Sequence, residues 1–275
     1  MRKLRLSAAV LLAGFGLATA LQATSAGADV LDDIKKRGKL IVGVKADYKP
    51  FGFREPSGKI VGLEPDLAAD VAKKLGVELE LVPVIGANRM EFLSQGKIDL
   101  MIATMSDKPE RRKIVQVIEP LYYSDAVNVL MKKGAGIKTW EDLKGKKVCG
   151  STGAFYNKDV AQKYGPELIS FDGSEKPLLA LKNGDCVGYL YDQTFVVGKL
   201  TEDEWKGGFQ MVLPGIMEAA WAIAVKTGET GFQKLLEDMH KDWMKSGRIV
   251  ELEKKWGVPP TDYAKRTHEA AKAAK

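Results

Sequence analysis

The chain has 275 residues, with 42 Lys and Arg residues against 36 Asp and Glu residues and a formal net charge of +6. Three of the basic residues and no acidic residue fall in positions 1–28, so the remainder has 39 basic against 36 acidic residues and a net charge of +3. This weak, dispersed excess of positive charge argues against a nucleic-acid partner. Two Cys and two distant His residues (His240 and His268) cannot form a tetrahedral metal site, so we expect no metal and no cofactor.

The N-terminus has the three parts of a cleavable secretory signal. Three basic residues in the first five positions precede an apolar run over 6–21, and residues 26–28 read Ala-Gly-Ala. The run is short for a membrane span, and an A-x-A cleavage site follows it. No Cys lies near that site, so we expect no lipid anchor. The sequence therefore predicts a signal peptide over 1–28 and a periplasmic protein of about 250 residues, enough for one large or two medium domains.

The first half of the mature chain alternates predicted strands with predicted helices. Loop 45–53, after the first strand, is rich in aromatic residues, Pro and Gly. Loops at the carboxyl ends of strands are where open α/β sheets bind ligands. The alternation predicts a parallel sheet with crossover helices. The expected strands are 39–44, 78–83 and 98–103, and the expected helices are 63–75 and 89–94.

Two extended runs interrupt the alternation in the second half. They cover 121–131 and 218–225. We expect them to be strands shared by two lobes, with lobe 1 formed by 29–125 plus 221–275 and lobe 2 by 126–220. Other expected elements are strands 147–150, 168–171 and 186–191, a short helix capped by Thr139, and helices 157–164, 174–183, 232–246 and 249–256. We interpret the basic tail with Lys265, Arg266, Lys272 and Lys275 as a solvated helical end.

The buried strand 98–103 leads directly into a predicted helix. Pro109 suits the first turn of a helix, and Asp107 and Glu110 have capping-box spacing. The amides at the start of a helix carry a partial positive charge, so such a junction favours an anion.

The side chains at this junction suit a carboxylate. Thr104 and Ser106 offer hydroxyl donors, and Arg111 can hold a carboxylate through two parallel hydrogen bonds. The alternative is an ordinary connection with a solvated arginine.

The chain has two cysteines, Cys149 and Cys186, which both lie in apolar stretches typical of neighbouring strands. An even pair in an oxidising compartment favours a disulfide. Two buried free thiols are the alternative.

Six motifs in a fixed order resemble one family. The chain resembles the periplasmic amino-acid-binding proteins of ABC importers, solute-binding family 3, over residues 43–257. This resemblance implies an α/β fold with two lobes that close on a free amino acid about two β-crossings. It also implies a monomeric receptor without enzymatic activity that delivers its ligand to the permease subunits of an ABC transporter. The motifs are Tyr48-x-Pro50-Phe51, Gly62-Leu63-Glu64-Pro65-Asp66-Leu67, Asp99 through Arg111, Pro120-Leu121-Tyr122-Tyr123, Gly184-Asp185-Cys186 with Asp192, and Lys255-Trp256-Gly257.

By position, the resemblance assigns the amino-acid backbone to two charged residues. Arg111, helped by Thr104 and Ser106, would hold the α-carboxylate, Asp192 would pair with the α-ammonium, and Tyr48 would cover the ligand. A zwitterion that leaves water needs a fixed cation and a fixed anion, because an unpaired buried charge costs several kcal/mol. The alternative for Asp192 is a helix cap after the strand.

Lys45 and Arg89 fall where the aspartate- and glutamate-binding members of the family place cations. Together with Arg111 they would favour a second carboxylate on the ligand, so the resemblance implies an acidic amino acid. The alternatives are that Lys45 extends to solvent and that Arg89 pairs with Glu91 or Asp99.

The contribution of the second lobe departs from the family pattern. Ala rather than Thr or Ser follows Gly153, so the usual hydroxyl is missing unless residue 151 or 152 replaces it. Phe155 is expected to form an apolar wall and Asn157 a polar contact. Phe53, in the aromatic loop of lobe 1, completes the candidate binding set.

Two other functions use the same scaffold. A cyclohexadienyl dehydratase would need a positioned acid, for which Glu218 and Glu64 are the candidates near the cleft. A chemosensory receptor would use the same closed surface as a transport receptor.

Overall fold

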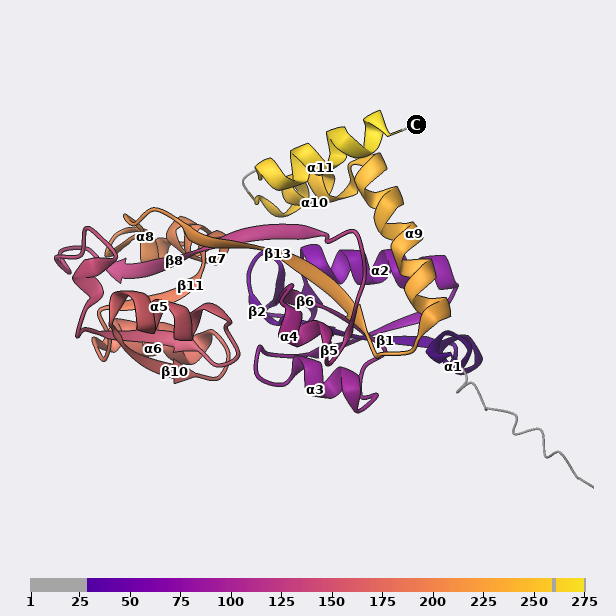
Figure 1. Ribbon diagram of the computed structural model, residues 1–275, viewed down its shortest axis with the longest axis horizontal. Coiled ribbons are helices and arrows are strands. Elements are labelled where there is room, and N and C mark those ends of the chain that lie inside the picture. The colour runs from indigo at the N-terminus through magenta and orange to yellow at the C-terminus, as the bar shows by residue number, and fades with distance from the viewer. Residues whose placement is uncertain (1–28, 259–260, 275) are drawn as a thin grey trace, which may run out of the picture.

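A computed structural model describes residues 29–258 and 261–274 of the chain (Figure 1). The predicted signal peptide, 1–28, lies outside the described residues. Among the helices of the described part, none is both long and apolar enough to cross a bilayer.

The described chain forms two α/β lobes, and one continuous ten-stranded sheet runs through both of them. Figure 1 shows the lobes side by side, with two long strands passing between them. In lobe 1, β1 pairs in parallel with β5 and β6, and in lobe 2, β9 pairs in parallel with β10 and β11. The predicted α/β class with two β-crossings is confirmed. The main strands are β1 (Lys39–Val44), β5 (Glu78–Pro83), β6 (Leu100–Ser106), β8 (Tyr123–Lys132), β9 (Lys147–Ser151), β10 (Glu167–Phe171), β11 (Gly188–Asp192) and β13 (Ile216–Val225).

Short strands complete the sheet structure. β7 pairs with β13 and β12 with β8, while β2, β3 and β4 form a small separate sheet that begins in the predicted aromatic loop and extends beyond it. Their bounds are β2 (Asp47–Tyr48), β3 (Gly52–Arg54), β4 (Ile60–Val61), β7 (Gln116–Val117) and β12 (Phe209–Gln210).

Helices cover the sheet of each lobe. The C-terminal helices α9 and α10 return to lobe 1, where they pack against α1 and α2 (Figure 1). The helices are α1 (Val30–Arg37), α2 (Leu63–Leu75), α3 (Arg89–Ser94), α4 (Pro109–Arg112), α5 (Tyr156–Tyr164), α6 (Glu175–Asn183), α7 (Gln193–Thr201), α8 (Asp203–Lys206), α9 (Thr230–Ser246), α10 (Arg248–Trp256) and α11 (Asp262–Ala273), with a 3₁₀ turn η1 (Glu141–Leu143).

Helix α4 differs from its prediction. It begins at Pro109 as expected, but it is only four residues long and Lys108 is its N-cap, without a side-chain cap bond. The expected capping box does not form, because the Asp107 carboxylate is held by Arg112, whose Nε lies 2.6 Å from it.

The crossing strands β8 and β13 pair antiparallel with each other, with Trp221 opposite Tyr123. An aromatic cluster packs around this pairing: the rings of Tyr123 and Trp221 lie 5.2 Å apart, and Phe51 lies 5.0 Å from both. Tyr48 joins the cluster and is fully buried. Buried aromatic area of this kind makes the base of the cleft a rigid support.

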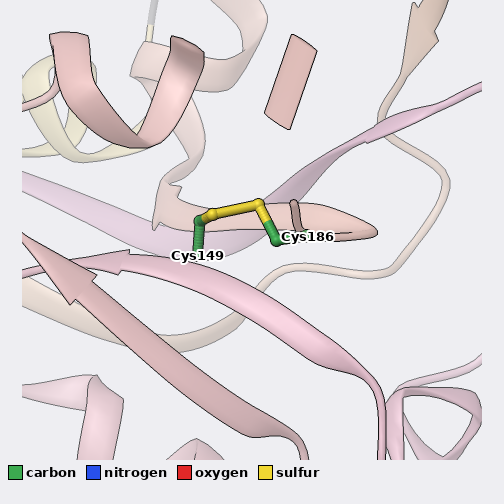
Figure 2. The surroundings of a disulfide bond; sticks show 2 residues. All are labelled: Cys149 and Cys186. Atoms are coloured by element: carbon green, nitrogen blue, oxygen red, sulfur yellow. A yellow bond between two sulfur atoms is a disulfide. The ribbon is translucent and has the colours of Figure 1, made fainter. Parts of the chain in front are cut away.

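The predicted disulfide is present. Cys149, on β9, is bonded to Cys186, which precedes β11, with their Cα atoms 5.7 Å apart (Figure 2). The pairing joins two neighbouring parallel strands of lobe 2.

The described C-terminal segment forms α11, and its basic residues 265, 266 and 272 are exposed as predicted, while Lys275 lies outside the described residues. However, α11 is also anchored. Ala264 is buried, and the Tyr263 hydroxyl donates to the Leu121 carbonyl at the start of the first crossing. The helix therefore packs on the crossing strand β8 as well as on α9 and α10.

Candidate functional site

A cavity lies between the two lobes, where the carboxyl ends of β6, β9 and β11 meet. Its free volume is about 30 Å³, room for about two water molecules, so the cleft is closed. Seven of the ten predicted binding residues line it. The lining residues are Lys45, Gly86, Arg89, Thr104, Ser106, Arg111, Ser151, Thr152, Gly153, Ala154, Phe155, Tyr156, Gly173, Tyr191 and Asp192.

Direct contacts between the lobes hold the cleft shut. Arg111 donates from Nη2 to the Gly153 carbonyl at 2.9 Å, and the Ser174 amide donates to the Asp47 carboxylate at 2.8 Å. The backbones also meet closely, since a Cβ added at Gly153 would lie 2.5 Å from the Gly86 carbonyl oxygen. Only glycine permits this approach.

Arg111 belongs to the wall of lobe 1. Its guanidinium is buried and donates from Nη1 to the Ser106 carbonyl at 2.9 Å, which fixes it at the end of β6. The alternative of a solvated arginine is therefore wrong. Burial, followed by repulsion from Arg89, lowers the pKa of Arg111 to about 10, so it remains a cation at neutral pH.

Thr104, at the same strand end, has a backbone strained for a β-branched residue, with φ of +48°. Its amide donates to Glu64 Oε1 at 2.7 Å, and the Tyr122 hydroxyl donates to the same oxygen at 2.5 Å. Burial raises the pKa of Glu64 to about 7, against the opposing effect of these two donors. Glu64 thus holds Thr104 in its conformation from behind the cavity wall.

Two further cations lie in the cavity, and neither does what the alternatives predicted. Lys45 is only 2% exposed and forms an ion pair with Asp47 at 2.8 Å, so it does not extend to solvent. Arg89 donates from Nη1 to the Ala103 carbonyl, while Asp99 is paired with Arg37 instead. The Nε of Arg89 is buried and has no hydrogen-bond partner among the described residues.

Asp192 forms the anionic side of the cavity, at the end of β11 in lobe 2. Asp192 is the N-cap residue of α7, as the alternative predicted, but its side chain makes no capping bond and lines the cavity instead. Burial raises the pKa of Asp192 to about 6, although the hydroxyls of Tyr156 and Tyr48 and the charge of Arg89 oppose that rise. The cavity therefore combines a fixed carboxylate with three fixed cations.

Three predicted residues do not line the cavity. Tyr48 lies behind it and binds the Thr194 hydroxyl, with 3.0 Å between the oxygens. Phe53 packs edge-on against Trp256, and Asn157 donates to the Ser151 carbonyl at 2.9 Å. The sequence placed these residues in segments near the cavity, whereas the alternation of side chains along a strand and their rotation around a helix decided where they point.

Lobe 2 adds cavity residues that the prediction lacked. Ser151 and Thr152, considered as substitutes for the missing hydroxyl, do line the cavity, as do the unpredicted Tyr156 and Tyr191. Tyr191 directly precedes Asp192 at the end of β11, and its position at a strand end is the sequence feature that would have indicated Tyr191 as a cavity residue. Phe155 lies against Lys108 of lobe 1, whose Nζ is 3.8 Å from the ring centroid.

Neither acid considered for a dehydratase lines the cavity. Glu64 lies behind Thr104, and Glu218, on β13, accepts from Ser124 at the hinge. In the described ranges 29–258 and 261–274, no group of His, Cys, Asp and Glu side chains could hold a metal ion.

Comparison with known proteins identifies the family. The model of the bacterial extracellular solute-binding proteins, family 3, matches residues 40–259. The chain belongs to this family. The relatives it matches are solute-binding proteins of ABC transporters.

Similar proteins within the family bind different solutes. The ABC transporter glutamine-binding protein GlnH of Bacillus subtilis is 32% identical, with coverage of 83% of this chain and 84% of the relative. The glutamate/aspartate import solute-binding protein of Salmonella typhimurium is 26% identical over 94% of this chain and 91% of its own. Among solved structures, a P235GK mutant of ArgBP from T. maritima has a TM-score of 0.77 and 29% identity, covering 83% of this chain and 99% of that one.

Proposed function

We propose that this family member is a periplasmic receptor that captures a free amino acid between its lobes and delivers it to the permease of an ABC transporter. The observation that supports this most directly is that Arg111 and Asp192, from opposite lobes, line one closed cavity. An α-amino acid presents a carboxylate and an ammonium group on neighbouring atoms. In a cleft opened to make room for it, its carboxylate would pair with Arg111 and its ammonium with Asp192.

The binding motion follows from the same arrangement. We place the lobe boundaries at 125/126 and 220/221, within β8 and β13, so that closure bends these two strands. Because the closed cavity has room for only about two water molecules, the lobes must open to admit an amino acid. The closed, monomeric receptor would then present the rims of both lobes to the permease.

The charges favour an acidic ligand. Lys45 is neutralised by Asp47, so Arg89 is the cation that a ligand backbone held by Arg111 and Asp192 would leave unpaired. Burial lowers the pKa of Arg89, and its Nε lacks a partner among the described residues. A second carboxylate on the ligand would satisfy both the charge and the donor. Glutamate or aspartate is therefore the proposed ligand.

Isothermal titration calorimetry of the mature protein, refolded from denaturant to remove bound ligand, tests both levels of the proposal. The ligands are glutamate, aspartate, their amides, arginine and cystine. We expect the acidic ligands to bind at least about tenfold more tightly than the amides, a free-energy difference of about 1.4 kcal/mol. Tight binding of an amide or of arginine instead would remove the acidic preference and leave the receptor role intact. Absence of binding by any amino acid would remove that role.

Two variants test whether Arg89 causes the proposed preference for acidic ligands. Arg89→Met should reduce the affinity for the acidic ligands much more than that for the amides. Arg54→Met is the matched control, because Arg54 is exposed and likewise donates to a backbone carbonyl, that of Gly58. Equal losses for acids and amides in Arg89→Met would show that Arg89 does not select the ligand side chain.

A further inference from the structure

A chain of polar side chains joins the hinge to the anionic side of the cavity. Asp125, on crossing strand β8, accepts from the Thr194 amide at 2.9 Å and lies 2.6 Å from the Thr194 hydroxyl. That hydroxyl lies 3.0 Å from the hydroxyl of Tyr48. Tyr48 in turn interacts with Asp192. The chain thus crosses from lobe 2 to lobe 1 and back, and it links two carboxylates through two hydroxyls.

The number of protons in this chain limits how it can be arranged. Each hydroxyl has one proton to donate, and an ionised carboxylate only accepts. With one proton on Asp125, the donors run from Asp125 through Thr194 and Tyr48 to Asp192. With that proton on Asp192, every donor reverses. The chain has three contacts and its two hydroxyls supply two protons, so one further proton, shared between the carboxylates, gives every contact a donor. When both carboxylates are ionised, each hydroxyl can donate to its neighbouring carboxylate, and the contact between the hydroxyls of Thr194 and Tyr48 is then left without a proton.

The surroundings of the two carboxylates differ. Asp192 faces the cations Arg89 and Lys45 and the hydroxyl of Tyr156. Asp125 faces a second cavity of about 370 Å³ at the back of the hinge, whose lining among the described residues includes the acids Glu218 and Asp262 and the phenol of Tyr263, but no cation. Burial and the charge of Asp192 raise the pKa of Asp125 to about 8. The shared proton therefore resides mainly on Asp125, beside an opening to solvent.

We propose that Asp125 is a positioning residue that shares one proton with Asp192 through Thr194 and Tyr48, and that a ligand ammonium arriving at Asp192 expels this proton to solvent. This inference rests on the proposed function. The ammonium keeps its own three protons and compensates the negative charge of Asp192, which is one of the two causes that hold the proton on Asp125. The proton leaves through the hinge cavity to water or buffer. Binding then strengthens as pH rises from about 6 to about 8, since the free protein binds more protons than the complex.

Calorimetry in buffers of different ionisation enthalpy counts the released protons. With L-glutamate, and with every other amino acid that binds, phosphate, HEPES and Tris at pH 7.5 should show release of about half to one proton per ligand. Asp125→Asn should reduce the release to near zero at this pH. Glu218→Gln, which alters an acid of the same cavity outside the chain, should leave the release unchanged.

The link through Thr194 is tested separately. Thr194→Val removes the hydroxyl and should decouple the two carboxylates, whereas Thr194→Ser retains the hydroxyl and should restore the wild-type proton count. If Thr194 had only a structural role, its variants would change in affinity or melting temperature, but the proton count would not be lost in Thr194→Val and restored in Thr194→Ser. Tight binding without a buffer-dependent enthalpy in the wild type would overturn the inference and leave the receptor role standing.

If no amino acid binds, the proposed function fails, and the ligand-free protein still tests the shared proton. Carbon-13 NMR of the aspartate carboxyl groups should show Asp125 and Asp192 titrating as a coupled pair above their usual range. Independent titrations of both groups near pH 4 would overturn the inference.

Discussion

Replacement of Arg111 by methionine tests the central contact of the site. Arg111 is 6% exposed, donates to Ser106 and Gly153, and is the proposed partner of the ligand α-carboxylate. Loss of one partner from a buried, hydrogen-bonded charge pair costs about 2–5 kcal/mol, because the other charge remains desolvated. At about 1.4 kcal/mol for each factor of ten, this predicts an affinity loss of about 30- to 4,000-fold.

The assay is isothermal titration with the tightest-binding amino acid, combined with thermal unfolding of the free protein. Arg112→Met is the matched control: Arg112 is the next residue of α4, but its side chain is 40% exposed and pairs with Asp107 and Glu119 instead. Exposed pairs contribute at most about 1 kcal/mol to stability, so the control should bind like the wild type. Affinity in Arg111→Met within about threefold of the wild type, in a folded protein, would refute the carboxylate assignment.

Two further predictions concern closure and stability. Gly153→Ala should weaken ligand binding and leave the liganded protein more open by small-angle X-ray scattering, because φ is +82° there and the added Cβ would lie 2.5 Å from the Gly86 carbonyl oxygen; an unchanged closed envelope would contradict this. Glu64, with its pKa raised from 4.5 to about 7, binds more protons in the folded than in the unfolded state between these values. The free energy of unfolding should therefore fall by about 3 kcal/mol as pH rises from 4.5 to 7. Glu64→Gln should remove that fall in urea unfolding at pH 5 and 8, and parallel pH slopes for variant and wild type would contradict the cause.

The sequence by itself determined the features of this protein that depend on neighbouring residues. The alternation of apolar strands and amphipathic helices predicts the α/β class, and two extended runs predict the crossings that became β8 and β13. The apolar strand ending in Thr104 and Ser106 placed Arg111 in the cleft, because a side chain one turn into the next helix stays near the strand end. An even pair of cysteines in apolar stretches favoured a disulfide between Cys149 and Cys186, and this disulfide is present.

The sequence determined the ends and the N-caps of the helices less well. Asp107 and Glu110 have the spacing of a capping box, yet Arg112 holds the Asp107 carboxylate and the box does not form. An ion pair between Asp107 and Arg112, the last residue of the same helix, competes with a local cap, and spacing alone does not show which interaction is stronger.

The tertiary structure alone decided which polar groups meet. Lys45 and Asp47 are two residues apart, but their burial as a pair depends on the closure of lobe 2, whose Ser174 donates to Asp47. Asn157 was expected in the cavity, but its position on α5 turns its amide back to the Ser151 carbonyl.

The same holds for the link between the hinge and the cleft. Asp125 and Asp192 are far apart in sequence, and only the pairing of β8 with β11 brings their strands together. Hydrophobic periodicity is a property of neighbouring residues and is visible in the sequence. Electrostatic coupling depends on distances and desolvation across elements, and these exist only after the lobes have folded and closed.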